Sequence, residues 1–483
     1  MHSHLKRQAV RSIWLVSICA SVGFALEGEP SQTMVLRLLT PITSYSPAGT
    51  RFDAKVIGPE LREGVDFLPN GSTVTGKLDK TGSVRLGLWR ERALLKLEFD
   101  GCKLPDGTAI GCEVTLEGVD NAREKVTENR VEGVLAAGHP YCWLNGFWYR
   151  PVTSLISHSA TGATGAEGAL YAHFAPTPLG AVAVLTSRLV LLRLPDPEIE
   201  LPAGTDLLAR VQVRGAFTPA LEPRAPLRPE LSEWVGGQSE EVYLPDKKLA
   251  GDLIHLVFVG SGEQVERAFR AAGWTPSDPL TRRSFARMYS AFLAMKADPS
   301  APVAPLTYRG STAAMVFQKT YNTVAKRHHI RIWPASFAGT QLWLAAATHD
   351  TAIALDTKRM SLTHRIDPLI DRERSTVVND LLNAGCISKM GLVERPQAVR
   401  LADSGKPGVT DGNATVLFLN DCSAPAPPTS EVPVLQHRRI TLVTRRFVLE
   451  DRQYLVRGSA FYWIYRAGCS LWARKFQSAD IGD

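Results

Sequence analysis

A turn phrase that occurs four times is the feature that most constrains how this chain can fold. It reads SPAGT at 46–50, LPNGS at 68–72, LPDGT at 104–108 and LPAGT at 201–205. Proline fixes the backbone at the start of a turn, and the glycine two residues later supplies left-handed backbone angles. The residues after each phrase alternate between apolar and polar side chains, which is typical of strands. We therefore expect residues 34–215 to form a β barrel or sandwich of repeated hairpins.

The amino terminus has the three-part plan of a secretory signal. Basic residues within the first eleven positions precede the apolar run SIWLVSICASVGFAL at 12–26, in which Gly23 and Ala25 are small residues before a cleavage point. The run is short for a membrane span, and no other segment has eighteen unbroken apolar residues. We expect residues 1–25 to be a cleaved signal peptide and the protein to be exported, periplasmic or associated with the cell envelope. A retained amino-terminal anchor is the alternative.

Composition narrows the class of partner. The chain has 483 residues, 45% hydrophobic and 21% charged, which is typical of a globular protein with several domains. Its formal net charge of +7 is spread along the chain, and no basic run is interleaved with aromatic residues. We therefore expect no nucleic-acid partner and no transmembrane span beyond the signal segment. Cell-envelope components are the candidate partners.

The cysteines suit an oxidising compartment. Six lie outside the amino-terminal apolar run, and six cysteines allow fifteen pairings. In GCKLPDGTAIGC, Cys102 and Cys112 flank a turn at Asp106–Gly107 at nearly equal separations, and we expect hairpin pairing to set them opposite each other. We predict this disulfide, and Cys386 with Cys422 as a second pair.

Two proline-rich segments are predicted to be linkers. One is 216–239, which begins FTPALEPRAPLRPELSEWVG, and the other is 396–433, which contains APAPPTSEVP. They delimit a middle region at 240–395 and a carboxy-terminal region at 434–483. The last region alternates in hydrophobicity and is predicted to add a few terminal strands.

The middle region is predicted to contain both strands and helices, unlike the amino-terminal region, which is predicted to contain strands alone. The apolar run DLIHLVFVG at 252–260 predicts a strand. Amphipathic segments at 261–274, with Ser261 as its cap, and at 278–295 predict two helices. Short strands are expected between 306 and 364, followed by a third helix that ends at Gly385. This order predicts an α+β domain.

The same region resembles a known family. The ordered motifs LVFVGS, AGW, APLTYRG, RHHIRIW, AATHD and THRIDPLIDRER are similar to the LssY carboxy-terminal domain, over residues 240–395. In some bacterial membrane proteins this domain follows a phosphatidic-acid-phosphatase-like segment. This sequence has neither that segment nor a set of spanning helices, so a lipid-phosphate activity does not carry over. The resemblance implies a domain type without an established activity or cofactor.

Four of the eleven histidines lie between residues 328 and 374 and define the candidate site. We expect His329, His349 and His364 to approach one another at the ends of adjacent strands, with Asp367 or Asp371 completing the site. The catalytic candidates are His329, Arg331, His349, Asp350, His364 and Asp367, and the metal candidates are His329, His349, His364 and Asp371.

These side chains allow three interpretations. Imidazoles and a carboxylate could bind zinc or another divalent metal ion that activates water. Without a metal, one histidine could act as a general base while Arg331 holds an anionic group. The structural alternative pairs the histidines with Asp350 and Asp367, the latter capping a helix with Pro368 in its first turn. No ligand pair at a diagnostic spacing decides among them.

Two functional hypotheses follow. The first is an exported cell-envelope protein with a binding or assembly role. The second is a hydrolase, metal-dependent in one version, that acts on phosphoester or other anionic substrates through the His/Asp site. The cofactor is undetermined by sequence, and a divalent metal ion is the candidate.

Overall fold

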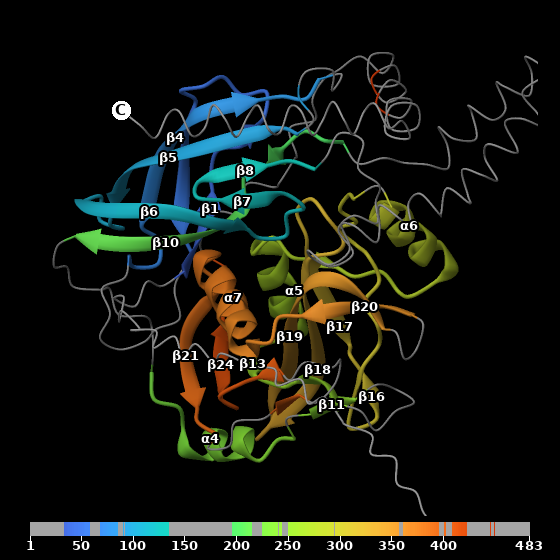
Figure 1. Cartoon of the computed structure of the whole chain (residues 1–483). Coiled ribbons are helices and arrows are strands. Elements are labelled where there is room, and N and C mark those ends of the chain that lie inside the picture. The colour runs from blue at the N-terminus through green and yellow to red at the C-terminus, as the bar shows by residue number, and fades with distance from the viewer. Residues whose placement is uncertain are drawn as a thin grey trace, which may run out of the picture. The chain divides into compact units, whose positions relative to one another are not determined.

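The computed structural model contains two groups of elements, a β barrel formed before residue 215 and a helix-covered mixed sheet formed after residue 224 (Figure 1). The structure describes residues 33–57, 68–85, 90, 92–134, 196–214, 225–239, 241–243, 250–293, 295–356, 361–395, 400–401, 408–422, 445 and 449. The predicted signal peptide, residues 1–25, lies outside the described residues. No helix among the described residues has the length and apolar character needed to cross a bilayer.

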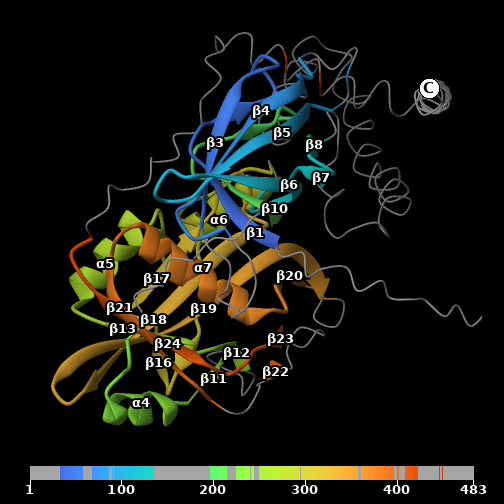
Figure 2. The same ribbon diagram turned by 90° about the vertical axis from the view of Figure 1, so that its left-hand side faces the viewer.

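Six described strands of the amino-terminal region close into a barrel, in the order β4-β3-β1-β10-β6-β5 with β5 paired back to β4 (Figure 2). They are β1 (Thr33–Leu38), β3 (Arg51–Val56), β4 (Thr73–Gly82), β5 (Leu94–Lys103), β6 (Ala109–Val119) and β10 (Asp206–Arg214). The short strands are β2 (Ile42–Thr43), β7 (Lys125–Thr127), β8 (Arg130–Glu132) and β9 (Glu200–Leu201). Of the two architectures predicted for the repeated hairpins, the structure has the barrel.

The four turn phrases position four of these strands. Each phrase ends at the residue before β3, β4, β6 or β10. The glycine of each phrase has φ between +85° and +91°, a conformation that glycine adopts without the steric cost of a Cβ. In three phrases the residue after glycine donates its N–H to the proline carbonyl. The repeated phrase is therefore a local signal that starts a barrel strand, as predicted.

The hairpin of β5 and β6 carries the predicted disulfide with one difference in register. Cys102 and Cys112 are bonded, with Cα atoms 6.1 Å apart. The loop comprises residues 105–107 rather than Asp106–Gly107 alone, so Cys102 lies opposite Ile110. A three-residue loop of this kind ends in a left-handed glycine. Cys112 therefore lies two residues beyond the position opposite Cys102. The cysteines are thus diagonal neighbours on one face, not directly opposed residues.

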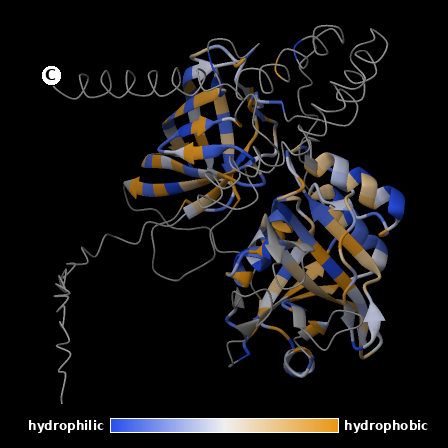
Figure 3. Ribbon diagram, turned by 45° about the vertical axis from the view of Figure 1, so that its right-hand side comes forward, coloured by the Kyte–Doolittle hydropathy of each residue, from blue (hydrophilic) through white to orange (hydrophobic). Residues whose placement is uncertain are grey.

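Alternation along the barrel strands produces the core. Apolar and polar colours alternate along these strands in Figure 3, and the buried positions of β4 fall at every second residue over its first half. Core residues include Leu36, Phe52, Leu78, Leu97, Leu116 and Ala209. Period-two alternation with one buried face is what a small barrel filled by its own side chains requires.

The second group is built on a sheet in the order β14-β17-β18-β19-β13-β24-β21, with β20 also paired to β19. Its strands are β13 (Leu256–Val259), β14 (Thr275–Pro276), β17 (Met315–Lys319), β18 (Arg327–Phe337), β19 (Thr340–Asp356), β20 (Ser361–Ile366), β21 (Ile387–Val393) and β24 (Ala414–Leu419). Only the pairing of β13 with β24 is parallel within this described sheet.

Helices cover one face of this sheet. The helices are α5 (Gly262–Ala271) and α7 (Ile370–Asn383), whose apolar residues Phe269 and Leu381 share a core with Phe258 and Ile330. Ser261 caps α5 through a capping box, as its sequence predicts. A third helix, α6 (Arg282–Leu293), packs Phe292 into a separate small core. Helix α7 begins after Leu369, two residues later than predicted, because Asp367 accepts the Leu369 N–H instead of capping the helix.

The opposite face of the sheet is covered by a helix from the segment predicted to be a linker and by a small second sheet. They are α4 (Pro229–Gly236) and a four-stranded sheet of β11 (Glu241–Tyr243), β12 (Ala250–Leu253), β15 (Thr307–Tyr308) and β16 (Ser311–Thr312). Leu231, Val235 and Tyr308 pack there against Trp333 and Leu344. Because strands β18 and β19 are buried on both faces, alternate residues of each strand belong to different cores.

Both predicted linkers contain regular structure. Segment 216–239 includes α4, because proline is compatible with the first turn of a helix. Leu231 and Val235, four residues apart on this helix, are buried. Segment 396–433 includes β22 (Arg400–Leu401), β23 (Gly408–Val409) and the central strand β24. The run ATVLFL has the length and composition of a strand, but it lies within a proline-rich segment, and proline content is a poor guide to a strand this short.

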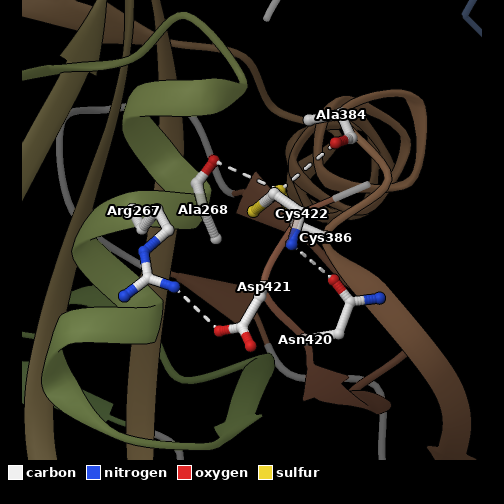
Figure 4. The surroundings of a disulfide bond; sticks show 7 residues. All are labelled: Arg267, Ala268, Ala384, Cys386, Asn420, Asp421 and Cys422. Carbon is white, nitrogen blue, oxygen red and sulfur yellow. Dashed lines mark hydrogen bonds and ion pairs between the residues drawn. A yellow bond between two sulfur atoms is a disulfide. The ribbon is translucent and has the colours of Figure 1, made fainter. Parts of the chain in front are cut away.

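The second predicted disulfide links the segment after α7 to the end of β24 (Figure 4). Cys386 and Cys422 are bonded, with Cα atoms 3.9 Å apart. Next to this link, Arg267 of α5 donates to Asp421 at 2.8 Å. Beyond it, the described residues Arg445 and Leu449 are helical, which differs from the strands predicted for 434–483. The rest of that tail lies outside the described residues.

Candidate metal centre

The antiparallel pairing of β18 with β19 decides which histidines share a face. His328 lies opposite His349, and His329 lies opposite Thr348. Directly opposed residues point to the same side of a sheet, whereas neighbours along one strand point to opposite sides. His349 therefore shares a face with His328, and the predicted grouping of His349 with His329 is wrong.

Asp120 joins the face that carries His328 and His349. It follows strand β6 of the barrel directly and is buried. Its Oδ2 is 2.8 Å from His328 Nε2, and its Oδ1 is 3.2 Å from His349 Nε2. The two imidazole rings are stacked, with centroids 4.1 Å apart and planes inclined by 15°. The side chains of Asp120, His328 and His349 are 11%, 3% and 15% exposed, so the cluster is largely shielded from water.

A second carboxylate holds His328 from the other side. Glu373 of α7 has its Oε2 at 2.7 Å from His328 Nδ1. Burial alone would lower the pKa of His328, but Glu373 and Asp120 outweigh burial and raise that pKa well above its usual value. Burial would likewise raise the pKa of Asp120, yet His349 and His328 lower it well below its usual value. The cluster therefore combines two carboxylates with a positively charged imidazole.

The donor set of this cluster fits a divalent metal ion. One ligand atom each from Asp120, His328 and His349 lies within 4.8 Å of the other two. In a tetrahedral zinc site with bonds of about 2.1 Å, ligand atoms are about 3.4 Å apart. The distances of 2.8 and 3.2 Å between Asp120 and the two histidines are close to this value, so small shifts of the side chains would admit the ion. The polar contact of His349 Nε2 is with Asp120 Oδ1, at 3.2 Å, so one cation could bind both atoms. Glu373 on His328 Nδ1 is the outer carboxylate that commonly orients a metal-bound histidine.

The opposite face carries a second cluster around Asp350. Its Oδ2 is 3.3 Å from His364 Nδ1 and 3.6 Å from His329 Nδ1, and it accepts a hydrogen bond from Arg327 Nε at 2.9 Å. His329 Nε2 is 2.7 Å from the Thr348 hydroxyl. This is the arrangement that the structural alternative predicts, with Asp350 as the partner of the histidines.

Arginines give this second cluster the opposite electrostatic character. Burial, which exceeds the favourable effect of Asp350, lowers the pKa of His329 well below its usual value and also lowers that of His364. Both imidazoles are therefore neutral. Burial would raise the pKa of Asp350, but His364, His329 and Arg327 lower it. Because Arg327 already supplies a positive charge, this face offers little attraction to a metal ion.

The three remaining predicted site residues have other roles. Arg331 donates to Asp252 and to the Ala304 carbonyl, and it is buried, so it does not present its guanidinium to a ligand. Asp367 accepts the Leu369 N–H at 2.9 Å. Asp371 accepts from the Thr410 hydroxyl at 2.6 Å and from the Asp411 N–H at 2.9 Å. Neither aspartate joins a histidine cluster among the described residues.

Ion pairs next to the metal centre also connect the barrel with the sheet. Arg37 of β1 binds Asp206 through two bonds of 2.7 Å and reaches Asp380 of α7 at 2.7 Å. Asp380 also accepts from Lys319 Nζ and from Trp274 Nε1, both at 2.8 Å. Burial would raise the pKa of Asp380, but Arg37 and Lys319 lower it to about 2. The candidate centre thus lies at a buried polar junction between barrel and sheet.

Sequence reasoning missed Asp120, His328 and Glu373 as members of the centre. Asp120 is separated from His328 by 208 residues, and no local pattern marks it. The partnership of His328 with His349 did have a signal in the two-residue turn Ala338–Gly339, where both residues have positive φ. Such a turn fixes the register of the flanking strands and would have placed these two histidines opposite each other.

Together the described elements define a β-rich protein in which a closed barrel precedes a mixed sheet covered by helices. Residues 240–414 match the family model of the LssY C-terminus, so this part of the chain is an LssY-like carboxy-terminal domain. The match confirms the resemblance of the motifs and extends it beyond residue 395. His328, His349 and Glu373 lie within the matched residues, and Asp120 lies outside them. No curated protein matches the chain.

Proposed function

We propose that the protein is an exported cell-envelope protein that binds a divalent metal ion through Asp120, His328 and His349. The convergence of these three ligand atoms at a buried position carries the proposal. Among the described residues, two carboxylates and no arginine contact the two histidines, so the cluster has the charge that a divalent cation requires. Such an ion would displace the proton of His328 and would link the barrel to the LssY-like domain.

Export is supported by two features of the chain. The apolar run after the basic amino terminus has the plan of a signal peptide. Both disulfides, Cys102–Cys112 and Cys386–Cys422, suit an oxidising compartment.

A binding or assembly role at the envelope fits a metal centre that is almost closed to solvent. The helices packed on the mixed sheet also support an α+β classification for the LssY-like domain.

Metal content of purified protein tests the proposal. We expect about one zinc or manganese ion per chain after incubation with either metal and removal of excess. His349→Ala should weaken binding by about 100-fold or more, because one of three protein ligands is lost. His364→Ala is the matched control, since it removes an imidazole of the Asp350 cluster and should retain the metal. Metal-free wild-type protein after loading, or equal binding by His349→Ala, would reject the centre.

A metal-dependent hydrolase is the second candidate function. Its support is that three protein ligands leave one position of a tetrahedral ion for water or substrate, as in catalytic zinc sites. A bound ion could lower the pKa of a water molecule into the neutral range. Asp120, His328 and His349 would hold the ion, and Glu373 would fix the orientation of His328. Turnover of a phosphoester such as p-nitrophenyl phosphate that disappears in His349→Ala and persists in His364→Ala would favour this candidate.

A further inference from the structure

Helix α6 and Leu280, two residues before it, carry three exposed large apolar side chains. Six large hydrophobic residues are exposed among the described residues, and three of them are Leu280, Phe285 and Tyr289. Their exposed fractions are 57%, 51% and 43%. Phe285 and Tyr289 are one helical turn apart, and their rings are stacked with centroids 6.5 Å apart. The remaining three are isolated in sequence, so α6 presents the one linear patch of this kind in the described chain.

Two exposed arginines lie at the start of α6. Arg282 precedes Phe285 by three residues and Tyr289 by seven, which places all three on one side of the helix. Arg283 is its exposed neighbour. Neither arginine has an ion-pair partner among the residues that the structure describes. Arg287, in contrast, is bound by Asp278 at 2.7 Å and Asp298 at 3.0 Å, and it fastens the helix to the protein.

Contacts near both ends of α6 hold the helix in place, and the Phe292 ring also lies next to Tyr289, with centroids 6.3 Å apart. Phe292 is buried against Val324 and Ala325, and Met288 packs on the same small core. Ser284 forms hydrogen bonds with Thr281 and with the Pro279 carbonyl at the start of the helix. The exposed aromatic side is therefore presented by an anchored helix.

We infer that α6 docks on an anionic lipid bilayer, with Phe285 and Tyr289 inserted at the headgroup level and Arg282 and Arg283 on lipid phosphates. Aromatic and basic residues on one side of a short helix are the composition of interfacial helices. The three apolar side chains could bury on the order of 300 Å². A stable protein interface buries about 800 Å² per partner, whereas interfacial binding needs only a few inserted side chains and charge attraction.

Vesicle sedimentation of the full chain tests this inference independently of the metal centre. Wild-type protein should bind vesicles of phosphatidylglycerol and phosphatidylcholine in equal parts and should bind phosphatidylcholine vesicles much more weakly. The double variant Phe285→Ser/Tyr289→Ser should reduce the partition coefficient by about tenfold or more, because buried apolar area is lost. Arg282→Gln and Arg283→Gln should each reduce it by about fivefold, and added salt should diminish their contribution.

Matched variants on other surfaces provide the control. Lys103→Gln and Lys125→Gln remove exposed basic residues of the barrel and Leu392→Ser removes an exposed apolar side chain, so all three should bind as wild type. Every variant is prepared with the same amino terminus as wild type, so differences between them report on the substituted side chains. Unchanged binding in the α6 variants, or no binding of wild type to anionic vesicles, would overturn the inference. Self-association that requires Phe285 and Tyr289 without vesicle binding would overturn it as well and would identify a second copy as the partner.

Discussion

On one face of the β18–β19 pair, Asp120 contacts His328 and His349. On the other face, Asp350 contacts His329 and His364. Each cluster has two imidazoles and one central aspartate, and each is largely buried, yet their charges are arranged differently. Glu373 adds a second carboxylate to the first cluster, whereas Arg327 adds a cation to the second.

The difference shows that the composition of a histidine cluster does not define its chemistry. The charged residues next to each cluster decide whether its imidazoles are protonated and whether the cluster attracts a metal ion. The carboxylates of the first cluster come from the barrel and from α7, whereas Asp350 comes from the sheet itself. The Asp120 cluster therefore forms only where barrel and sheet meet, whereas the Asp350 cluster forms within the sheet.

The largest expected effect is a difference in the free energy of unfolding between variants of Asp350 and Asp120. Asp350→Asn leaves Arg327 buried without its carboxylate and should lower the free energy of unfolding by about 3–5 kcal/mol. Asp120→Asn should cost about 2 kcal/mol in the presence of a chelator, because His328 retains Glu373. Urea unfolding of both variants measures the difference. A larger loss for Asp120→Asn than for Asp350→Asn would contradict the comparison.

The outer carboxylate of the first cluster gives the next effect. Glu373→Gln should weaken metal binding by about 10–100-fold, because the orienting charge on His328 Nδ1 is lost while all three ligands remain. Titration calorimetry with zinc measures this change. Asp371→Asn is the control on the same helix, since Asp371 binds Thr410 and Asp411 and contacts no member of the cluster. Equal weakening by both variants would assign the effect to helix α7 as a whole.

The smallest expected effect concerns a third kind of histidine. His255 is buried, and burial together with Arg374 and Arg395 lowers its pKa to about 3. The unfolded chain takes up a proton near pH 6.5 while the folded protein does not, so stability is complete above that pH and is lost as pH falls toward 3. Its share is about 1 kcal/mol between pH 6.5 and pH 5.5. His255→Gln should reduce the pH dependence of thermal unfolding by that amount, and an unchanged dependence would refute the assignment.

Local chemistry explains which parts of the fold could be predicted. The turn phrases, the capping box at Ser261 and the hairpin disulfide depend on residues within a few positions of one another, and the sequence identified them. The strand β24 was missed because proline content drew attention away from a short apolar run. Its position between β13 and β21 depends on long-range pairing that no local pattern encodes.

The candidate site shows the same division. The alternation of side chains along β18 and along β19 follows from each strand by itself, whereas the grouping of their histidines depends on the register between the two strands. That register depends on the turn Ala338–Gly339, in which alanine adopts positive φ and is therefore an unusual turn residue. Asp120 could not be assigned, because its approach to His328 depends on how the barrel meets the sheet.

The place of β24 has a practical consequence for anyone who wishes to produce the LssY-like domain alone. The family match ends at residue 414, where this strand has only begun. A fragment cut there would expose one edge of β13 and would leave β21, the last strand of the described sheet, without the strand that it pairs with. Exposed edges of this kind promote aggregation. Cys386 would also lose its partner. The shortest fragment expected to remain monomeric extends through Cys422.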